Sequence, residues 1–167
     1  KKTFKSYIHE FLEEQGAEDD IQKFELASVT LNVLHIERTF IDKIMSVKRH
    51  AICESLDKKV RHIYDVTRLF TLPEIQDFLR DKTELKRLIR ITKETDSYYL
   101  EKRGITKEYN PKGAYDFDSW KHYLTPQIRL RYETLHKDLL YTDEQQKFDD
   151  ALHAFSDISK IFAEICE

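Results

Sequence analysis

The sequence predicts a mainly α-helical fold, in which a multi-helix lobe follows one helix and one or two short β-strands. Three glycines and three prolines in 167 residues are far below the average share of about 12%, which excludes collagen-like and turn-rich all-β architectures. Twenty aromatic residues among 40% apolar ones supply a core. Charged residues reach 35% without long blocks of one sign, so intrinsic disorder is excluded as well.

The first 36 residues contain one predicted helix and one predicted strand. Apolar residues recur at helical spacing over residues 4–12, and Gly16 is placed to end that helix. Residues 29–36, VTLNVLHI, alternate in polarity and predict a strand. Because a lone strand cannot satisfy its backbone, we expect a partner from KFEL upstream or from sequence preceding Lys1.

Helical periodicity continues through the rest of the chain. Helices are predicted over about 38–54, 57–70 and 82–99, with a short helix opened by the capping box TLPE (71–74), a loop over 100–117, a helical pattern interrupted at Pro126, and a last helix capped by TDEQ (142–145). The chain lacks an initiating Met, so we expect it to be a truncated form of a longer protein.

Cysteine usage and hydropathy predict a cytoplasmic protein without a membrane partner. Cys53 and Cys166 lie far apart with no CxxC spacing, which indicates neither a disulfide framework nor a zinc site. No apolar run approaches 18 residues, and the first residues lack the apolar core of a signal peptide.

Charge is unevenly distributed along the chain. Residues 37–70 carry eight Lys/Arg and five Asp/Glu, whereas residues 142–167 carry two and seven. The basic stretch is a local indication of a phosphate-bearing partner, although a solvated helix face gives the same pattern.

Two charged residues stand out within this basic stretch. Lys43 shares a helix face with Phe40 and Val47, so it either extends its ammonium to solvent or is held there for a function. Asp65 lies four residues after Arg61 and three before Arg68, a spacing that predicts an ionic strip. An ordinary surface ion pair explains that spacing equally well.

The two segments together resemble a known family. ERTFIDKI (37–44), followed 22 residues after its lysine by the aspartate of RHIYD (61–65), is similar to the second half of AbiEii/AbiGii-type toxin nucleotidyltransferases. The preceding strand strengthens the likeness, which spans roughly residues 4–80. It implies a cytoplasmic toxin–antitoxin protein of abortive infection, a form of phage defence.

The resemblance also implies a site. In that family an N-terminal lobe of the polymerase-β type holds Mg²⁺ through a Gly-Ser turn and an Asp-x-Asp/Glu pair, and a helical lobe supplies a lysine and an aspartate. Lys43 and Asp65 would be these catalytic residues, with Arg38, Arg61 and Arg68 as phosphate-binding or orienting contacts. The implied partners are an NTP, an RNA acceptor such as a tRNA end, and a cognate antitoxin.

The metal-binding half of that pattern is not found here. The only D-x-D, Asp116–Asp118, precedes a helix without the strand needed to present two carboxylates, and Asp118 or Ser119 is expected to cap that helix. We therefore expect residues 1–36 to be a remnant of the nucleotidyltransferase lobe and residues 37–167 to form the helical domain. No metal ligands, no bound cofactor and no activity are expected of this chain alone.

Two other functions remain open on the sequence. Arg131 and His136 match the R-x4-6-H pattern of HEPN-type ribonucleases, with Tyr132 where that family has a polar residue. The chain could also be a non-catalytic helical module that binds protein or nucleic acid.

The helix lengths predict how Lys43 and Asp65 lie in space. Helices 38–54 and 57–70 are joined by about two residues and should form a hairpin. Both side chains then stand roughly 15 Å from the turn, at nearly equal height. If they face one groove they meet, either as a functional pair or as a plain salt bridge.

Overall fold

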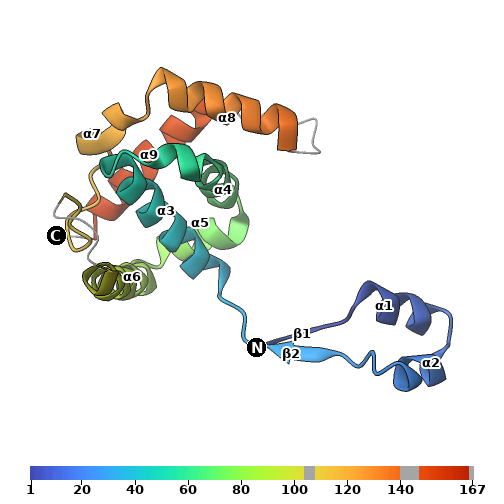
Figure 1. The fold of residues 1–167 in the computed structure, drawn as a ribbon. Helices are drawn as coiled ribbons and strands as arrows, with labels where there is room; N and C mark the ends of the chain where they lie inside the picture. Colours follow the sequence, from blue (N-terminus) through green and yellow to red (C-terminus); the bar gives the residue numbers. More distant parts are fainter. Residues whose placement is uncertain (104–107, 140–146, 166–167) are drawn as a thin grey trace. The chain divides into compact units, whose positions relative to one another are not determined.

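The computed structural model describes residues 1–103, 108–139 and 147–165, and it confirms the mainly α-helical class. The chain divides into two compact units, Lys1–His35 and Ile36–Glu167. Figure 1 shows the elements of both units in chain order. The first is called the N-terminal unit below, and the second the helical unit.

The N-terminal unit is a two-stranded antiparallel sheet whose strands are connected by two short helices. Its elements are β1 (Lys2–Phe4), α1 (Tyr7–Glu14), α2 (Glu18–Lys23) and β2 (Val29–Leu31). Thr3 pairs with Thr30. Both expected strand partners, KFEL and sequence preceding Lys1, are therefore wrong, since β2 pairs with residues 2–4 of the same chain. β2 is also shorter than the predicted 29–36.

Caps at both ends fix the length of α1. The Ser6 hydroxyl accepts a hydrogen bond from the His9 backbone N–H at 3.1 Å, so the helix begins at Tyr7 and Phe4 stays in the strand. At the other end Gly16 adopts φ 68°. The N–H groups of Gly16 and Ala17 reach the carbonyls of Glu13 and Leu12 at 3.0 and 2.9 Å, as in a Schellman motif.

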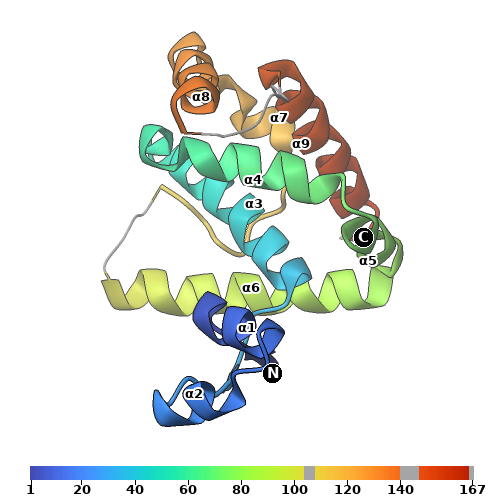
Figure 2. The same cartoon turned by 90° about the vertical axis from the view of Figure 1, so that its right-hand side faces the viewer.

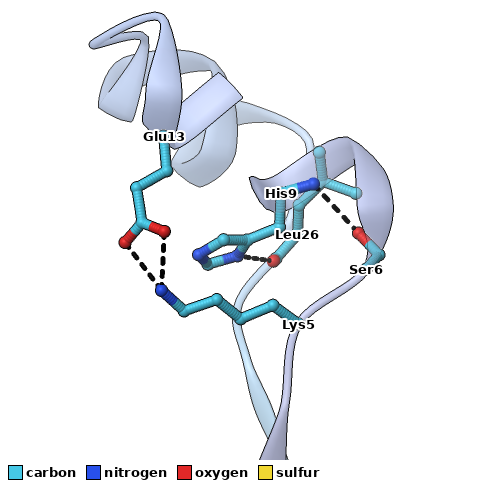
Figure 3. Close-up of polar contacts among 5 residues, drawn as sticks. All are labelled: Lys5, Ser6, His9, Glu13 and Leu26. Atoms are coloured by element: carbon cyan, nitrogen blue, oxygen red, sulfur yellow. Dashed lines mark hydrogen bonds and ion pairs between the residues drawn. The ribbon is translucent and has the colours of Figure 1, made fainter. Parts of the chain in front are cut away.

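Polar contacts tie the rest of the N-terminal unit together (Figure 3). The His9 ring Nδ1 donates to the Leu26 carbonyl at 2.6 Å, linking α1 to the segment after α2. Lys5 Nζ lies 2.7 and 2.6 Å from the two carboxylate oxygens of Glu13, and these hydrogen bonds lower the pKa of that carboxyl. Local hydrogen bonds, rather than an apolar core, therefore hold this unit.

Apolar side chains of the N-terminal unit are largely exposed. Tyr7 is 92% exposed, Ile8 61% and Phe11 60%. Within residues 1–35, all of which the structure describes, His9 alone is buried. The N-terminal unit therefore buries almost none of its apolar side chains.

The helical unit holds the core. Its α-helices are α3 (Ile36–Ile52), α4 (Val60–Phe70), α5 (Pro73–Arg80), α6 (Lys82–Arg103), α7 (Phe117–Trp120), α8 (Pro126–Leu139) and α9 (Phe148–Ala163). Short 3-10 turns, η1 (Leu56–Lys59) and η2 (Lys121–Tyr123), precede α4 and α8. No helix in the described parts of the chain has both the length and the hydropathy to cross a bilayer.

α3 is the central element of the helical unit. It contacts α4, α5, α6 and α7, and Figure 2 shows it passing between α6 and the remaining helices. Phe40, Ile41, Ile44 and Val47 are all fully buried. α3 is therefore enclosed on several sides, although its sequence is rich in charge.

Several predicted boundaries differ from the observed ones. The TLPE box does not form, because α5 begins after Leu72 without a side-chain cap, and the Thr71 hydroxyl donates to the Arg68 carbonyl instead. α6 extends to Arg103, into the predicted loop. The TDEQ sequence at 142–145 lies outside the described residues.

An aromatic cluster anchors the segment before α7 onto α9. Trp120 makes edge-to-face contacts with Tyr115, Phe117 and Phe155, with ring centroids 4.8–5.8 Å apart. Tyr115 also contacts Phe162 at 5.2 Å. Such pairs contribute about 0.5–1.5 kcal/mol each beyond area burial. They hold residues 115–120 against a helix more than thirty positions later.

α3 also ends in a Schellman-type turn, and, as at Glu25 after α2, the left-handed position is not glycine. Glu54 adopts φ 50°. The N–H groups of Glu54 and Ser55 reach the carbonyls of Ala51 and His50 at 3.1 and 2.8 Å. A side chain at this conformation costs backbone energy that glycine avoids.

Replacing Glu54 by glycine should therefore stabilise the helical unit. We expect Glu54→Gly to raise the free energy of unfolding by about 0.5–1 kcal/mol, measured by urea denaturation. Glu54→Ala is the matched control, since it removes the same carboxylate but keeps the strained φ. A Glu54→Ala variant as stable as Glu54→Gly would assign the effect to charge instead.

Candidate functional site

The candidate site lies where α3 and α4 pack together. Lys43 on α3 donates from Nζ to Oδ2 of Asp65 on α4 at 2.6 Å. The two side chains are 25% and 27% exposed. The short connection through η1 brings residues 22 positions apart to the same height, as the helix lengths predict. The pair is neither covered by the core nor freely solvated.

Arg38 lies one turn before this pair on α3. Its Nε donates to Asp42 Oδ1 at 2.8 Å, and the arginine side chain is only 16% exposed. This bond keeps the Arg38 side chain against α3. It uses only one of the five N–H donors of the guanidinium group.

Arg61 and Arg68 flank Asp65 on α4, and both are exposed. Among the described residues Arg61 has no ion-pair partner. The predicted Arg61–Asp65 contact is absent from the described contacts, because Asp65 points across to Lys43 instead. Arg61 therefore keeps its charge available one helical turn from the pair.

His62 is a member of this site that the sequence reasoning missed. It precedes Asp65 by three residues and so shares its face of α4. Burial, together with the nearby Lys43 ammonium, lowers the pKa of His62 to about 4. Its Nδ1 is buried without a hydrogen-bond partner among the described residues. The i, i+3 spacing to Asp65 is the only sequence signal for it, and that spacing is common.

A metal site is not formed by the described residues. Nowhere in the described ranges do three His, Cys, Asp or Glu side chains cluster, and the Asp65 carboxylate is engaged by an ammonium. These residues do not fit a Mg²⁺ ion, which prefers several oxygen ligands. The D-x-D motif is structural: Asp116, rather than the expected Asp118 or Ser119, caps α7 by accepting from the Asp118 N–H at 3.2 Å.

The described structure does not assemble a site from the two residues of the ribonuclease motif, Arg131 and His136. Arg131 Nη1 lies 3.4 Å from Asp57 Oδ2, and Tyr132 between the two motif residues is fully buried. The side chain of His136 lies outside the described part of the chain.

Comparison with known proteins identifies the family. Residues 2–154 match the family described as "Nucleotidyl transferase AbiEii toxin, Type IV TA system". The chain belongs to the AbiEii nucleotidyltransferase toxin family. No curated protein and no solved structure matches it.

AbiEii membership confirms the resemblance drawn from residues 37–44 and 61–65. The match also extends well beyond residue 80, through most of the helical unit. It implies nucleotidyl transfer, a nucleotide substrate and a type IV toxin–antitoxin role with an antitoxin partner. The ribonuclease alternative gains no support from it.

The Lys43–Asp65 ion pair should contribute measurably to stability. In a double-mutant cycle with Lys43→Met and Asp65→Asn, we expect a coupling energy of about 1 kcal/mol, at the upper end for solvent-accessible pairs because both groups are three-quarters covered. Urea denaturation of the four proteins measures it. Additive losses from the single variants would show that the contact contributes nothing.

His62 should make stability depend on pH below neutrality. Its pKa is about 4 in the folded chain against a usual value of 6.5, so between these values the unfolded chain binds a proton that the folded chain does not. The free energy of unfolding therefore falls as pH is lowered through this window, and His62 contributes no such dependence above about pH 7.

His62→Gln removes the titrating ring and should flatten this dependence. We expect the variant to lose less stability than the unchanged chain between pH 7 and pH 5, measured by thermal unfolding. His122→Gln, at an exposed position, is the control. Equal losses in the His62 variant and the unchanged chain would contradict the assignment.

Proposed function

We propose that the protein transfers a nucleotide from an NTP to an RNA acceptor, such as the end of a tRNA, as a toxin controlled by a cognate antitoxin. The observation that carries the proposal is the partly exposed Lys43–Asp65 pair, formed by the two segments on which the family likeness rests. AbiEii membership supports the transfer chemistry, whereas the RNA acceptor is proposed here.

Lys43 would act on the triphosphate. In nucleotidyl transfer the acceptor hydroxyl oxygen bonds to the α-phosphorus while the bond to the β-phosphate oxygen breaks. Negative charge accumulates on the departing pyrophosphate, and the hydroxyl proton leaves to solvent or a base. An ammonium held at the β- and γ-phosphates stabilises that charge. Asp65, at 2.6 Å from Nζ, would fix the ammonium in position.

Arg61, Arg68 and Arg38 would complete the phosphate contacts. Arg61 lies on the same helix as Asp65 with its charge unpaired among described residues, and Arg68 is exposed one turn further along. Arg38 bonds to Asp42 through Nε and would contact phosphate through its two terminal NH2 groups. Guanidinium groups bind phosphate oxygens in pairs, which gives orientation as well as attraction.

The metal-holding carboxylates would come from outside these 167 residues. The described residues form no cluster that fits Mg²⁺, and we propose that residues 1–36 are the edge of a lobe that would supply it. The exposed apolar side chains of the N-terminal unit, such as Tyr7 and Ile8, support this because a further lobe would cover them. The chain alone would then be inactive.

The second candidate is a non-catalytic helical module that binds protein or nucleic acid. It would retain the Lys43–Asp65 pair as a plain salt bridge. Exchanging the two residues separates the proposals, because an exchanged pair keeps the salt bridge but moves the ammonium away from its position.

Nucleotide transfer is tested with the protein expressed from its natural start, labelled NTPs, Mg²⁺ and total RNA. We expect label on RNA, reduced on the order of 10²–10³-fold by Lys43→Met, as for the loss of one stabilising donor. The exchange Lys43→Asp with Asp65→Lys should abolish transfer while changing the free energy of unfolding by less than about 1 kcal/mol. The 167-residue chain should label nothing.

Lys121→Met is the matched control, because Lys121 also pairs with an aspartate, Asp118, at 2.7 Å. It should transfer normally. Absence of label with every NTP, or full activity in the exchanged variant, would contradict the proposal and favour the binding module.

A further inference from the structure

A basic pocket is formed on α6, separate from the candidate site. It has a volume of about 550 Å³. Four of its lining residues are cations, Lys86, Arg90, Lys93 and Lys112, and Glu94 is the one acidic residue among the described lining residues. The remaining lining comes from Ile89, Ala114 and Ile165.

The four cations of this pocket lack acidic partners among the described residues. Among described residues none of the four forms an ion pair, and Lys93 Nζ makes only a long contact of 3.5 Å to the Lys112 carbonyl. Elsewhere on the same helix Lys82 and Arg87 are each paired with a glutamate. Uncompensated positive charge is therefore concentrated at the pocket.

The three cations of α6 form a row. Positions 86, 90 and 93 follow the spacing that places side chains on one helix face, and the row is about 10 Å long at 1.5 Å per residue. Lys112 joins it from the segment before α7. Three cations spread over this length can each contact a phosphate of one strand, and such phosphate contacts dominate affinity for nucleic acid.

A buried lysine adds positive charge behind the pocket wall. Lys48 is only 7% exposed, and its Nζ donates to the carbonyl of Ala114 at 2.6 Å. Burial, and next the nearby Lys93 ammonium, lower the pKa of Lys48. The segment carrying Lys112 is thereby fixed to α3 by Lys48 and to α6 by Lys93.

The lining chemistry favours a sugar–phosphate backbone over other anions. No aromatic residue lines the described pocket, so a nucleobase would find no stacking surface, which disfavours a free nucleotide. Protein interfaces are depleted in lysine, yet three of the four cations are lysines. Contacts to phosphates need neither an aromatic surface nor a base-specific group.

We propose that the basic pocket binds the phosphate backbone of the RNA substrate. This inference rests on the proposed function, because RNA is a substrate only if nucleotide transfer proceeds to it. Lys48 and Lys43 are five residues apart on α3, so they point about 140° apart around the helix. The pocket therefore contacts RNA on a different side of α3 from the proposed nucleotide site.

The test measures RNA binding without catalysis. Fluorescence polarisation of a labelled 20-nucleotide RNA hairpin of arbitrary sequence is recorded with the 167-residue chain across 50–250 mM KCl. The triple variant Lys86→Gln, Arg90→Gln, Lys93→Gln should bind at least tenfold more weakly at 100 mM KCl. The slope of log affinity against log salt should fall by about 2, as for three lost phosphate contacts.

The matched control removes the same charge elsewhere. The triple variant Lys58→Gln, Arg80→Gln, Lys102→Gln neutralises three exposed cations. Lys102 is on α6 too, but it points to the opposite side of that helix from Lys93, about 180° around the axis. It should bind within twofold of the unchanged chain. Thermal unfolding checks that each variant is folded, and the double variant Lys86→Gln, Arg90→Gln provides a milder change.

Two outcomes would overturn the inference: unchanged RNA affinity in the folded triple variant, or equal weakening in the control. The proposed function fails independently of these results. Transfer of label to RNA together with normal RNA affinity in the triple variant would refute the pocket alone. Weakened RNA binding without any transfer would support the pocket and refute the proposed function.

Discussion

Enclosure of α3 by its neighbours is the constraint on which the helical unit depends. Phe40, Ile41, Ile44 and Val47 are fully buried, and they face different helices because α3 contacts α4, α5, α6 and α7. An enclosed helix cannot rotate without breaking several packed surfaces at once. The direction of each polar residue on α3 is thus fixed, including that of Lys43 toward α4.

Because α3 is enclosed, each of its buried or half-buried basic residues has its own hydrogen-bond or ion-pair partner. Lys48 is buried and donates to a backbone carbonyl, whereas Arg49 pairs with Asp96 of α6 at 3.0 Å. Burial raises the pKa of Asp96, although the arginine opposes the shift. Both contacts join α3 to segments distant in the sequence. They attach α6 and the segment before α7 to the central helix by charge as well as by apolar packing.

The chain carries a net charge of −3, so its positive surfaces are local. Among the described cations without an acidic partner are Arg61, beside the Lys43–Asp65 pair, and the row on α6. A negative protein with separate basic regions attracts phosphate at defined places rather than over its whole surface.

The N-terminal unit contrasts with the helical unit in what holds it. Its shape comes from the Ser6 cap, the Gly16 turn and the His9–Leu26 bond, all of them local. Such contacts specify conformation but contribute little stability, because each net hydrogen bond is worth only about 1 kcal/mol. Because its apolar side chains are exposed, this unit has a defined conformation but no hydrophobic core of its own.

The sequence by itself determined the helical class, the strand beginning at Val29, and the equal height of Lys43 and Asp65, because each depends on periodicity or on rise per residue along one or two helices. That the two side chains face each other was decided by packing. It did not place β1 opposite β2, since a three-residue strand has too little pattern to be recognised. The low pKa of His62, the burial of Lys48 and the basic pocket were decided by tertiary structure. Each requires segments far apart in the chain, such as α6, Lys112 and Ile165, to come together, and helix phase alone does not determine which faces meet.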